Sequence, residues 1–176
     1  SKRKDAEAAV SYYAEEGIPA EAVKEYLMNI ANSTFENWRR ANPDKSMDEY
    51  QLQLNKMSVS GALFDMVKLL DVSKTVISKM SAEEVYENAL NWASKYDQEL
   101  AEILKDKEYA LKVFGIERGN KKPRKDISKW SDVKENVEYM YNELFDKNEE
   151  EYPFQVINDK ESIEKILKLY VEKYYD

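Results

Sequence analysis

A run of cations in an otherwise acidic chain is the sequence feature best able to bind a charged ligand. Residues 118–134 carry seven Lys or Arg side chains and two Asp, whereas residues 135–151 carry seven acids and one Lys; the formal net charge is −8. Because a chain of this charge repels nucleic acid on average, phosphate binding needs such a local surface. The run predicts either a charged linker or an elbow whose cations hold a nucleic-acid backbone, namely Lys121, Lys122, Arg124, Lys125 and Lys129.

Aromatic residues accompany both basic regions of the chain. Trp130 lies near the end of the run, where it would either pack beneath the surface or stack on a base, and we expect it to be buried. Arg39 and Arg40 follow Phe35 and Trp38 at the end of a short predicted helix, where cations complement the helix dipole. The two arginines are therefore expected to stabilise that helix, with a secondary RNA contact as the alternative.

Composition excludes most catalytic and metal chemistry. The chain contains no His and no Cys, which removes Ser-His-Asp triads, thiol nucleophiles and the common zinc sites. The adjacent glutamates at residues 15–16 and 83–84 do not form a catalytic dyad, because neighbours on a helix point in different directions. Residues 146–157 imitate a calcium loop, but Glu151 stands where Gly is needed and Ile157 where a bidentate Glu is needed. We predict no metal site and no complete catalytic site.

The overall composition is typical of a folded, helix-rich globular chain. Hydrophobic residues make up 43% and charged residues 35% of the chain, with only 4 Gly and 4 Pro. No apolar run approaches the roughly 20 residues needed to cross a bilayer, and no signal peptide is expected. The absence of Cys fits a reducing compartment, so the cytoplasm is the expected location.

Helical periodicity predicts the elements that carry these residues. Apolar residues recur at helical spacing in residues 6–13, 23–30, 85–96, 133–144 and 163–174. A tight turn is expected between the first two helices, since Gly suits a helix end and Pro a helix start. Alternating residues predict one or two short strands within residues 51–61. The positions that signal the turn and the helix starts are Gly17, Pro19, Ser33, Ser46, Ser81 and Asn158, the last four each followed by Glu three residues later.

Residues 115–130 interrupt the helical periodicity. They hold two of the four glycines and one proline, so we expect a domain junction at about residues 118–125. The last helical stripe reaches the end of the chain without a cap, and further sequence is therefore expected beyond Asp176.

Three long stretches and the first three residues share the spacing of one known family. "AVSYYAEEGIPAEAVKEYLMNIA" has a helix ending in Gly, an apolar-Pro turn and an E-A-x-x-x-Y-L helix. "KMSVSGALFDMVKLLDVSKTVIS" has a V-S-x-G-x-x-F-D-x-x-K-L segment, and "KKPRKDISKWSDVKENVEYMYNELF" resembles the entry into an anticodon-binding region. Ser1, Lys2 and Arg3 match the end of a KMSKS-type ATP motif. The chain thus resembles the region that follows the catalytic domain in bacterial glutamyl-tRNA synthetases, although residues 71–73 depart from the family pattern.

The resemblance implies a mainly α fold and a role in tRNA docking. Residues 1–112 would form a helical stem-contact module, and residues 113–176 the first part of a helical anticodon-binding domain. Lys2 would bind the phosphates of ATP, which acts with Mg in the parent enzyme, while Ser1 and Arg3 would shape the loop. The implied partners are tRNA and an upstream catalytic domain of the same polypeptide, with no membrane or DNA partner. The parent would join glutamate to tRNA through glutamyl-adenylate, and this part alone is expected to be inactive and not to bind ATP.

Two other classes of function stay open at this point. An acidic helical protein-interaction module without RNA binding would need only a surface rich in Glu and Lys. Hydrolysis by carboxylates would need two acids buried in one pocket. Salt-dependent RNA binding distinguishes the first of these from tRNA docking.

Overall fold

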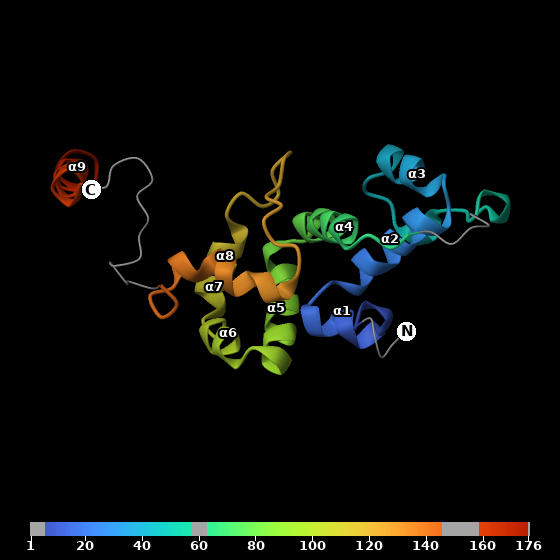
Figure 1. The fold of residues 1–176 in the computed structure, drawn as a ribbon, viewed down its shortest axis with the longest axis horizontal. Helices are drawn as coiled ribbons and strands as arrows, with labels where there is room; N and C mark the ends of the chain where they lie inside the picture. Colours follow the sequence, from blue (N-terminus) through green and yellow to red (C-terminus); the bar gives the residue numbers. More distant parts are fainter. Residues whose placement is uncertain (1–5, 58–62, 146–158, 176) are drawn as a thin grey trace. The chain divides into compact units, whose positions relative to one another are not determined.

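The chain is built from helices joined by short connections (Figure 1). The computed structural model describes residues 6–57, 63–145 and 159–175, and the chain divides into two compact units, residues 1–145 and 146–176. The second unit contains α9 (Lys160–Tyr174). In the first unit the α-helices are α1 (Val10–Glu16), α2 (Ala20–Ala31), α3 (Phe35–Ala41), α4 (Met66–Lys79), α5 (Ala82–Tyr96), α6 (Gln98–Ile103), α7 (Lys107–Gly115) and α8 (Val133–Val137), and the short 3-10 helices are η1 (Ala6–Ala8), η2 (Met47–Glu49), η3 (Leu54–Lys56), η4 (Trp130–Asp132) and η5 (Glu138–Met140).

The predicted mainly α class is confirmed, whereas the predicted short strands are absent from the described residues. Leu54–Lys56 form a 3-10 helix, and the extended pairing that is present is one isolated antiparallel bridge between Asn32 and Met57. The side chain of Leu54 is 76% exposed, so the alternation there does not mark a face that a sheet could bury. The rest of the predicted strand region, residues 58–62, lies outside the described residues.

The predicted turn between the first two helices is confirmed. α1 ends at Gly17, whose φ of 79° lies in the left-handed region that favours glycine. The backbone N–H groups of Gly17 and Ile18 donate to carbonyls in the last turn of α1. α2 begins directly after Pro19, so the two helices are joined by three residues.

Two of the predicted capping boxes are present and one is wrong. The hydroxyls of Ser46 and Ser81 accept backbone N–H groups at the starts of η2 and α5, and the Glu three residues later returns the bond in each case. The box predicted at Ser33 does not form, because α3 begins one residue later than the pattern requires. The Ser33 hydroxyl instead donates to the carbonyl oxygen of Lys56 at 3.3 Å, beside the isolated bridge.

A small first core lies between α2 and α4. Ile18, Ala22, Tyr26 and Leu69 are buried in it. The Tyr26 hydroxyl accepts the backbone N–H of Asp65 at 2.6 Å, and Asp65 caps the start of α4 with its carboxylate. This bond ties the beginning of α4 to α2.

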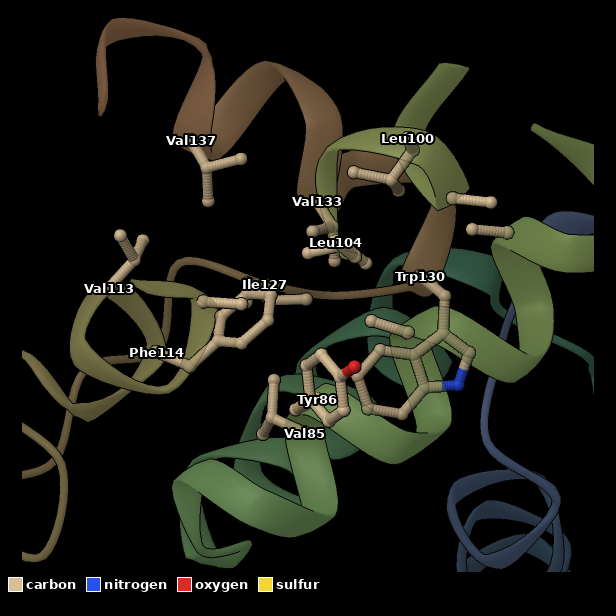
Figure 2. Close-up of a cluster of buried hydrophobic side chains, with 14 of the residues drawn as sticks. Val85, Tyr86, Leu100, Leu104, Val113, Phe114, Ile127, Trp130, Val133 and Val137 are labelled. Atoms are coloured by element: carbon tan, nitrogen blue, oxygen red, sulfur yellow. The ribbon is translucent and has the colours of Figure 1, made fainter. Parts of the chain in front are cut away.

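The larger second core joins the last turn of α4, α5, α6, α7 and the segment that leads into α8 (Figure 2). Leu100, Leu104 and Val133 are fully buried in it, and Trp130 is 5% exposed. The burial predicted for Trp130 is therefore confirmed. Among the members drawn in Figure 2 are Val85, Tyr86, Val113, Phe114, Ile127 and Val137.

The two cores share α4. Leu69, in the first half of this helix, belongs to the first core, whereas Ile77, near its end, belongs to the second. Val113 and Phe114 pack in the same core as Ala110, so buried contacts continue across the boundary predicted after residue 112. The functional division at that boundary stays a prediction.

The helix predicted over the last apolar stripe is present as α9. Its start is capped by Asp159, whose carboxylate accepts the backbone N–H groups of Glu161 and Ser162; the predicted cap, Asn158, lies outside the described residues. No residue of α9 is buried, and its apolar side chains are mostly exposed. None of the helices in the described ranges is both long and apolar enough to cross a membrane.

Two buried tyrosines of the first unit are expected to respond oppositely to removal of the hydroxyl. The Tyr26 hydroxyl holds the N–H of Asp65, whereas the Tyr141 hydroxyl has no hydrogen-bond partner among the described residues although the side chain is 6% exposed. Tyr26→Phe should lower the free energy of unfolding by about 1–2 kcal/mol, and Tyr141→Phe should leave it unchanged or raise it by up to about 1 kcal/mol. Urea denaturation at pH 7 measures both; equal losses in the two variants would contradict this account.

Tyr141 also gives rise to a prediction about the pH dependence of stability. Burial raises the pKa of Tyr141 from 10.0 to about 12. The unfolded chain releases the Tyr141 proton at a lower pH than the folded chain does. The contribution of the neutral Tyr141 side chain to stability is therefore fully present below pH 10 and is lost as the pH rises from 10 towards 12. Between these pH values Tyr141→Phe should therefore lose less stability than the unchanged chain, as followed by urea denaturation across the alkaline range. An identical pH dependence of the two proteins would contradict the raised pKa.

Candidate nucleic-acid interface

The basic run is not a free linker but a segment fastened to the helices around it. We call residues 118–131 the strap. It leaves α7, forms a loop that extends away from the helices and returns to η4 (Figure 1, gold to orange). Its contacts fall at three places, on the end of α4, the middle of α4 and the end of α1.

The first fastening is Arg118, at the end of α4. Its guanidinium donates to the carbonyl oxygens of Ile77 at 2.8 Å and Met80 at 3.1 Å, and its Nε donates to the carbonyl oxygen of Phe114 at 2.9 Å. Burial lowers the pKa of Arg118 from its ordinary value. This cation thus binds carbonyls at the ends of α4 and α7 and in the turn after α4; the Ile77 carbonyl also accepts the backbone N–H of Met80 at 3.1 Å.

The second fastening lies along the middle of α4. The Lys125 ammonium donates to the Thr75 hydroxyl at 3.1 Å, and the buried Ser73 hydroxyl donates to the carbonyl oxygen of Ser128 at 2.6 Å. A buried hydroxyl paired with a buried carbonyl fixes the register between strap and helix, since any slip would leave both groups without partners.

The third fastening covers the carbonyl end of α1. The backbone N–H of Trp130 donates to the carbonyl oxygen of Gly17 at 2.8 Å, and the Ser131 hydroxyl donates to that of Glu16 at 2.8 Å. From α5, the indole N–H of Trp92 donates to the carbonyl oxygen of Glu15 at 3.0 Å. The last carbonyls of α1, which lack partners within the helix, are thus satisfied by tertiary contacts.

An ion pair completes this third fastening. The Lys129 ammonium lies 2.5 Å from a carboxylate oxygen of Glu16, and the Lys129 side chain is 26% exposed. The hydrogen bond from this carboxylate raises the pKa of Lys129. Lys129 thus pairs with a carboxylate at the end of α1, and its predicted contact with RNA stays a prediction.

These contacts sort the cations of the basic run into two groups. Arg118 and Lys129 are engaged as described, Arg124 pairs with Asp126, and Lys134 pairs with Glu99. By contrast, Lys121 and Lys122 are exposed, and within the described ranges neither has an ion pair or a side-chain hydrogen bond. Exposed Lys125 has a single hydroxyl partner.

Residues 119–122, which we call the tip, present the two free lysines. Gly119 has a φ of 82°, and no atom lies within 4 Å of the position that a Cβ would occupy there. Glu117, just before the tip, also has a positive φ of 54°. The left-handed backbone turns the chain sharply just before Lys121 and Lys122, and both side chains are exposed.

α4 adds cations that sequence reasoning did not select. Lys68 and Lys79 are exposed, and they lie seven residues before and four residues after Thr75, which is helical spacing along one face; the Lys79 ammonium also donates to the carbonyl oxygen of Pro43. Because Lys125 contacts Thr75, a strap lysine lies between the two helix lysines. The spacing of Lys68 and Lys79 was readable from the sequence, but the position of the strap on that face was not.

The two predicted arginines of α3 differ in their surroundings. The Arg39 guanidinium is 5.1 Å from the ring centre of Trp38, its Nε is 2.8 Å from a Glu25 carboxylate oxygen, and the side chain is 17% exposed. It also donates to the carbonyl oxygen of Lys45 at 2.6 Å. Arg40 is 73% exposed and, among the described residues, pairs with Glu36 alone, on the same helix, an arrangement that contributes little stability. Of the two, Arg40 is the one available to a ligand.

The acids of the described residues lie at the surface. No Asp or Glu is buried in these ranges, where the buried polar residues are Asn32, Ser73, Ser78 and Ser128. Of the adjacent glutamates, Glu83 pairs with Lys107 and Glu84 caps α5. The same ranges hold no cluster of three or more acidic side chains able to bind a metal ion. The predicted ATP-loop residues Ser1, Lys2 and Arg3 lie outside the described residues.

Comparison with known proteins gives matches along nearly the whole chain. The chain is 49% identical over 178 residues to a glutamate–tRNA ligase of Clostridium perfringens and 45% identical over 175 residues to one of Acetivibrio thermocellus, in each case over 99% of this chain and 32% of the relative. A glutamate–tRNA ligase of Sorangium cellulosum is 51% identical over 148 residues, which is 84% of this chain and 26% of that protein. No family model matches the chain, and neither does any solved structure.

These matches confirm the resemblance that the sequence motifs predicted. The chain spans about one third of the length of the curated relatives, 32% for the first of them. The similarity therefore concerns one part of those ligases.

Proposed function

We propose, from the similarity of almost the whole chain to glutamate–tRNA ligases, that it is the tRNA-binding C-terminal portion of such an enzyme. The parent reaction would join glutamate to tRNA with ATP, through glutamyl-adenylate. The portion described here would dock the tRNA and position the neighbouring domains, and would not catalyse the reaction by itself.

The observation that carries this proposal is that some cations of the strap bind the surrounding helices while others are exposed to solvent. Arg118 and Lys129 fasten it to the helices, while Lys121 and Lys122 remain exposed at its tip. Lysines held on a fixed loop bind phosphate oxygens without first having to be ordered, which favours a backbone contact. Lys125 and the exposed lysines of α4 extend the basic surface from the tip along that helix.

The remaining assignments follow from the resemblance. Residues 1–112 would brace the tRNA stem, and residues 113–176 would begin the anticodon-binding part. ATP and Mg would act in a catalytic domain upstream in the same polypeptide, where Lys2 would approach the ATP phosphates, and this portion alone would not bind ATP. We place the protein in the cytoplasm, because charging of tRNA serves protein synthesis, and expect no DNA or membrane partner.

Titration of the chain with a glutamate tRNA transcribed in vitro tests the proposal. Binding at about 50 mM salt should weaken steeply by about 200 mM, with log K falling linearly against log salt concentration by about 0.7–0.9 per phosphate contact. Circular dichroism at both concentrations checks that the fold is unchanged. Failure to bind at low salt with the fold intact would overturn direct RNA recognition.

A protein-interaction role is the second candidate, and α9 is the observation that favours it. Ile166, Leu167, Tyr170, Val171 and Tyr174 are each more than 50% exposed. A helix that leaves such residues uncovered within its own unit gains stability from an apolar partner. This candidate predicts no binding of tRNA at any salt concentration, so the same titration distinguishes the two.

A further inference from the structure

The junction between α4 and α5 is held by a side chain that comes from beyond α7. α4 ends at Lys79 and α5 begins at Ala82, so only two residues make the turn. Arg118 donates to carbonyl oxygens at the end of α4 and in the turn, at 2.8 and 3.1 Å, and to the end of α7. One guanidinium thus connects three elements: the last turn of α4, the turn itself and the last turn of α7.

The position of Arg118 does not suit direct contact with a phosphate. Its guanidinium is partly removed from water, which lowers its pKa, and three hydrogen bonds direct it at backbone carbonyls. A cation that contacts nucleic acid by steering and counterion release needs instead to face the solvent, as Lys121 and Lys122 do. Arg118 therefore differs from its neighbours in the basic run in what it can do.

The junction matters because the basic surface extends over both of its sides. Lys68 and Lys79 belong to α4, which contributes to both cores, whereas Lys121 and Lys122 lie three and four residues beyond Arg118. The guanidinium of Arg118, with its three hydrogen bonds to carbonyl oxygens, lies where the strap leaves α7 and meets α4. The separation between the helix lysines and the tip lysines is therefore set at this side chain.

We infer that Arg118 is a positioning residue for RNA binding, which holds the tip and the face of α4 in one arrangement without itself contacting RNA. The inference rests on the proposed tRNA-binding function. Loss of the three Arg118 hydrogen bonds leaves every exposed lysine in place but frees the first part of the strap, which includes the tip, to adopt other arrangements, while the contacts from Lys125 onward still hold the rest. RNA must then select the binding arrangement, which weakens affinity through conformational entropy and not through lost ion contacts.

Salt dependence separates positioning from contact. Removal of a phosphate contact lowers the slope of log K against log salt concentration by about 0.7–0.9, so the effect shrinks as salt rises. Loss of positioning lowers log K by the same amount at every salt concentration, because the number of counterions released is unchanged. In a plot of log K against log salt concentration, loss of a contact therefore gives a line that converges with that of the unchanged chain as salt rises, whereas loss of positioning gives a parallel line.

The experiment compares Arg118→Gln and Arg118→Lys with the unchanged chain, using the glutamate tRNA transcript between about 50 and 200 mM salt. Both variants should bind about 3- to 10-fold more weakly with an unchanged slope. Lys keeps the charge but cannot reproduce the planar fork that reaches three carbonyls, so it should not restore affinity. Lys121→Gln is the comparison for a contact residue and should reduce the slope.

A matched control accounts for loss of stability alone. Val85→Ala removes buried volume from the second core without removing any of the three hydrogen bonds of Arg118, and lowers the thermal midpoint. Measured well below that midpoint, it should bind RNA as the unchanged chain does, while the Arg118 variants should not.

Three results would overturn the inference while leaving the proposed function intact. These are a reduced slope in Arg118→Gln, full rescue of affinity by Arg118→Lys, and affinity loss in Val85→Ala equal to that of the Arg118 variants at equal thermal midpoint. Absence of binding by the unchanged chain would instead refute the proposed function, and with it the premise of the inference.

Discussion

Replacing Gly17 by Ala is expected to lower the free energy of unfolding by about 3 kcal/mol, through two effects at one position. The backbone of Gly17 has a φ of 79°, which costs a residue with a Cβ roughly 1–2 kcal/mol. The added Cβ would also lie 2.9 Å from both the Cβ and the backbone N of Trp130, and 3.0 Å from the indole N of Trp92. Neither backbone nor a core indole can yield cheaply, so the end of α1 must separate from the strap.

Gly119 provides the matched control, because it shares the backbone conformation without the contacts. Its φ is 82°, and nothing lies within 4 Å of its Cβ position. Gly119→Ala should therefore lose only the conformational part, roughly 1–2 kcal/mol. Urea denaturation of both variants measures the difference. A loss at Gly17 no greater than that at Gly119 would show that the end of α1 does not depend on close approach to Trp130.

The largest effect on RNA binding is expected from reversing the two tip charges together. If each tip lysine neutralises one phosphate, each contact contributes about eightfold in affinity at about 0.1 M salt, so the variant carrying Lys121→Glu and Lys122→Glu should bind about 60-fold more weakly, before repulsion by the new acids. The tip is exposed and its lysines have no partners among the described residues, so the fold should be unaffected.

Arg40→Glu is the comparison for this prediction. Arg40 is exposed, and within the described part of the chain its one ion pair is with Glu36, so its reversal also leaves the cores intact. It removes one secondary contact at most and should weaken binding by no more than about eightfold. Fluorescence anisotropy with a labelled glutamate tRNA transcript ranks the two variants. A greater loss from Arg40→Glu than from the tip variant would refute the tip as the main phosphate contact.

Local signals predicted the helices well because each signal acts within a few residues. Gly17 and Pro19 ended one helix and began the next, and Ser81 capped α5 with the Glu three residues later. The box at Ser33 does not form because α3 begins one residue later, and the Ser33 backbone N–H that the Glu would accept donates instead to the carbonyl oxygen of Lys56. Similarly, the strand predicted from two leucines that alternate with polar residues is absent from the described residues, because no neighbouring strand exists among them to bury that face.

The site could be predicted as a region but not residue by residue. Charge along the sequence identified the run that becomes the strap, and the aromatic residue near its end was correctly expected to be buried. What the sequence could not show is that Glu16, 113 residues before Lys129, supplies its counter-charge, or that carbonyls of α4 bind Arg118. Sorting cations into fastening and exposed groups requires knowledge of these distant partners.

The most direct measurement of the central claim, that the fastened strap presents its tip lysines to RNA, is the salt dependence of tRNA binding by the unchanged chain and by the variant carrying Lys121→Gln and Lys122→Gln. The account predicts that log K falls linearly with log salt concentration for both proteins, with a slope smaller by about 1.4–1.8 in the variant. Two parallel lines, or an unchanged chain that keeps its fold and binds no tRNA at low salt, would contradict it.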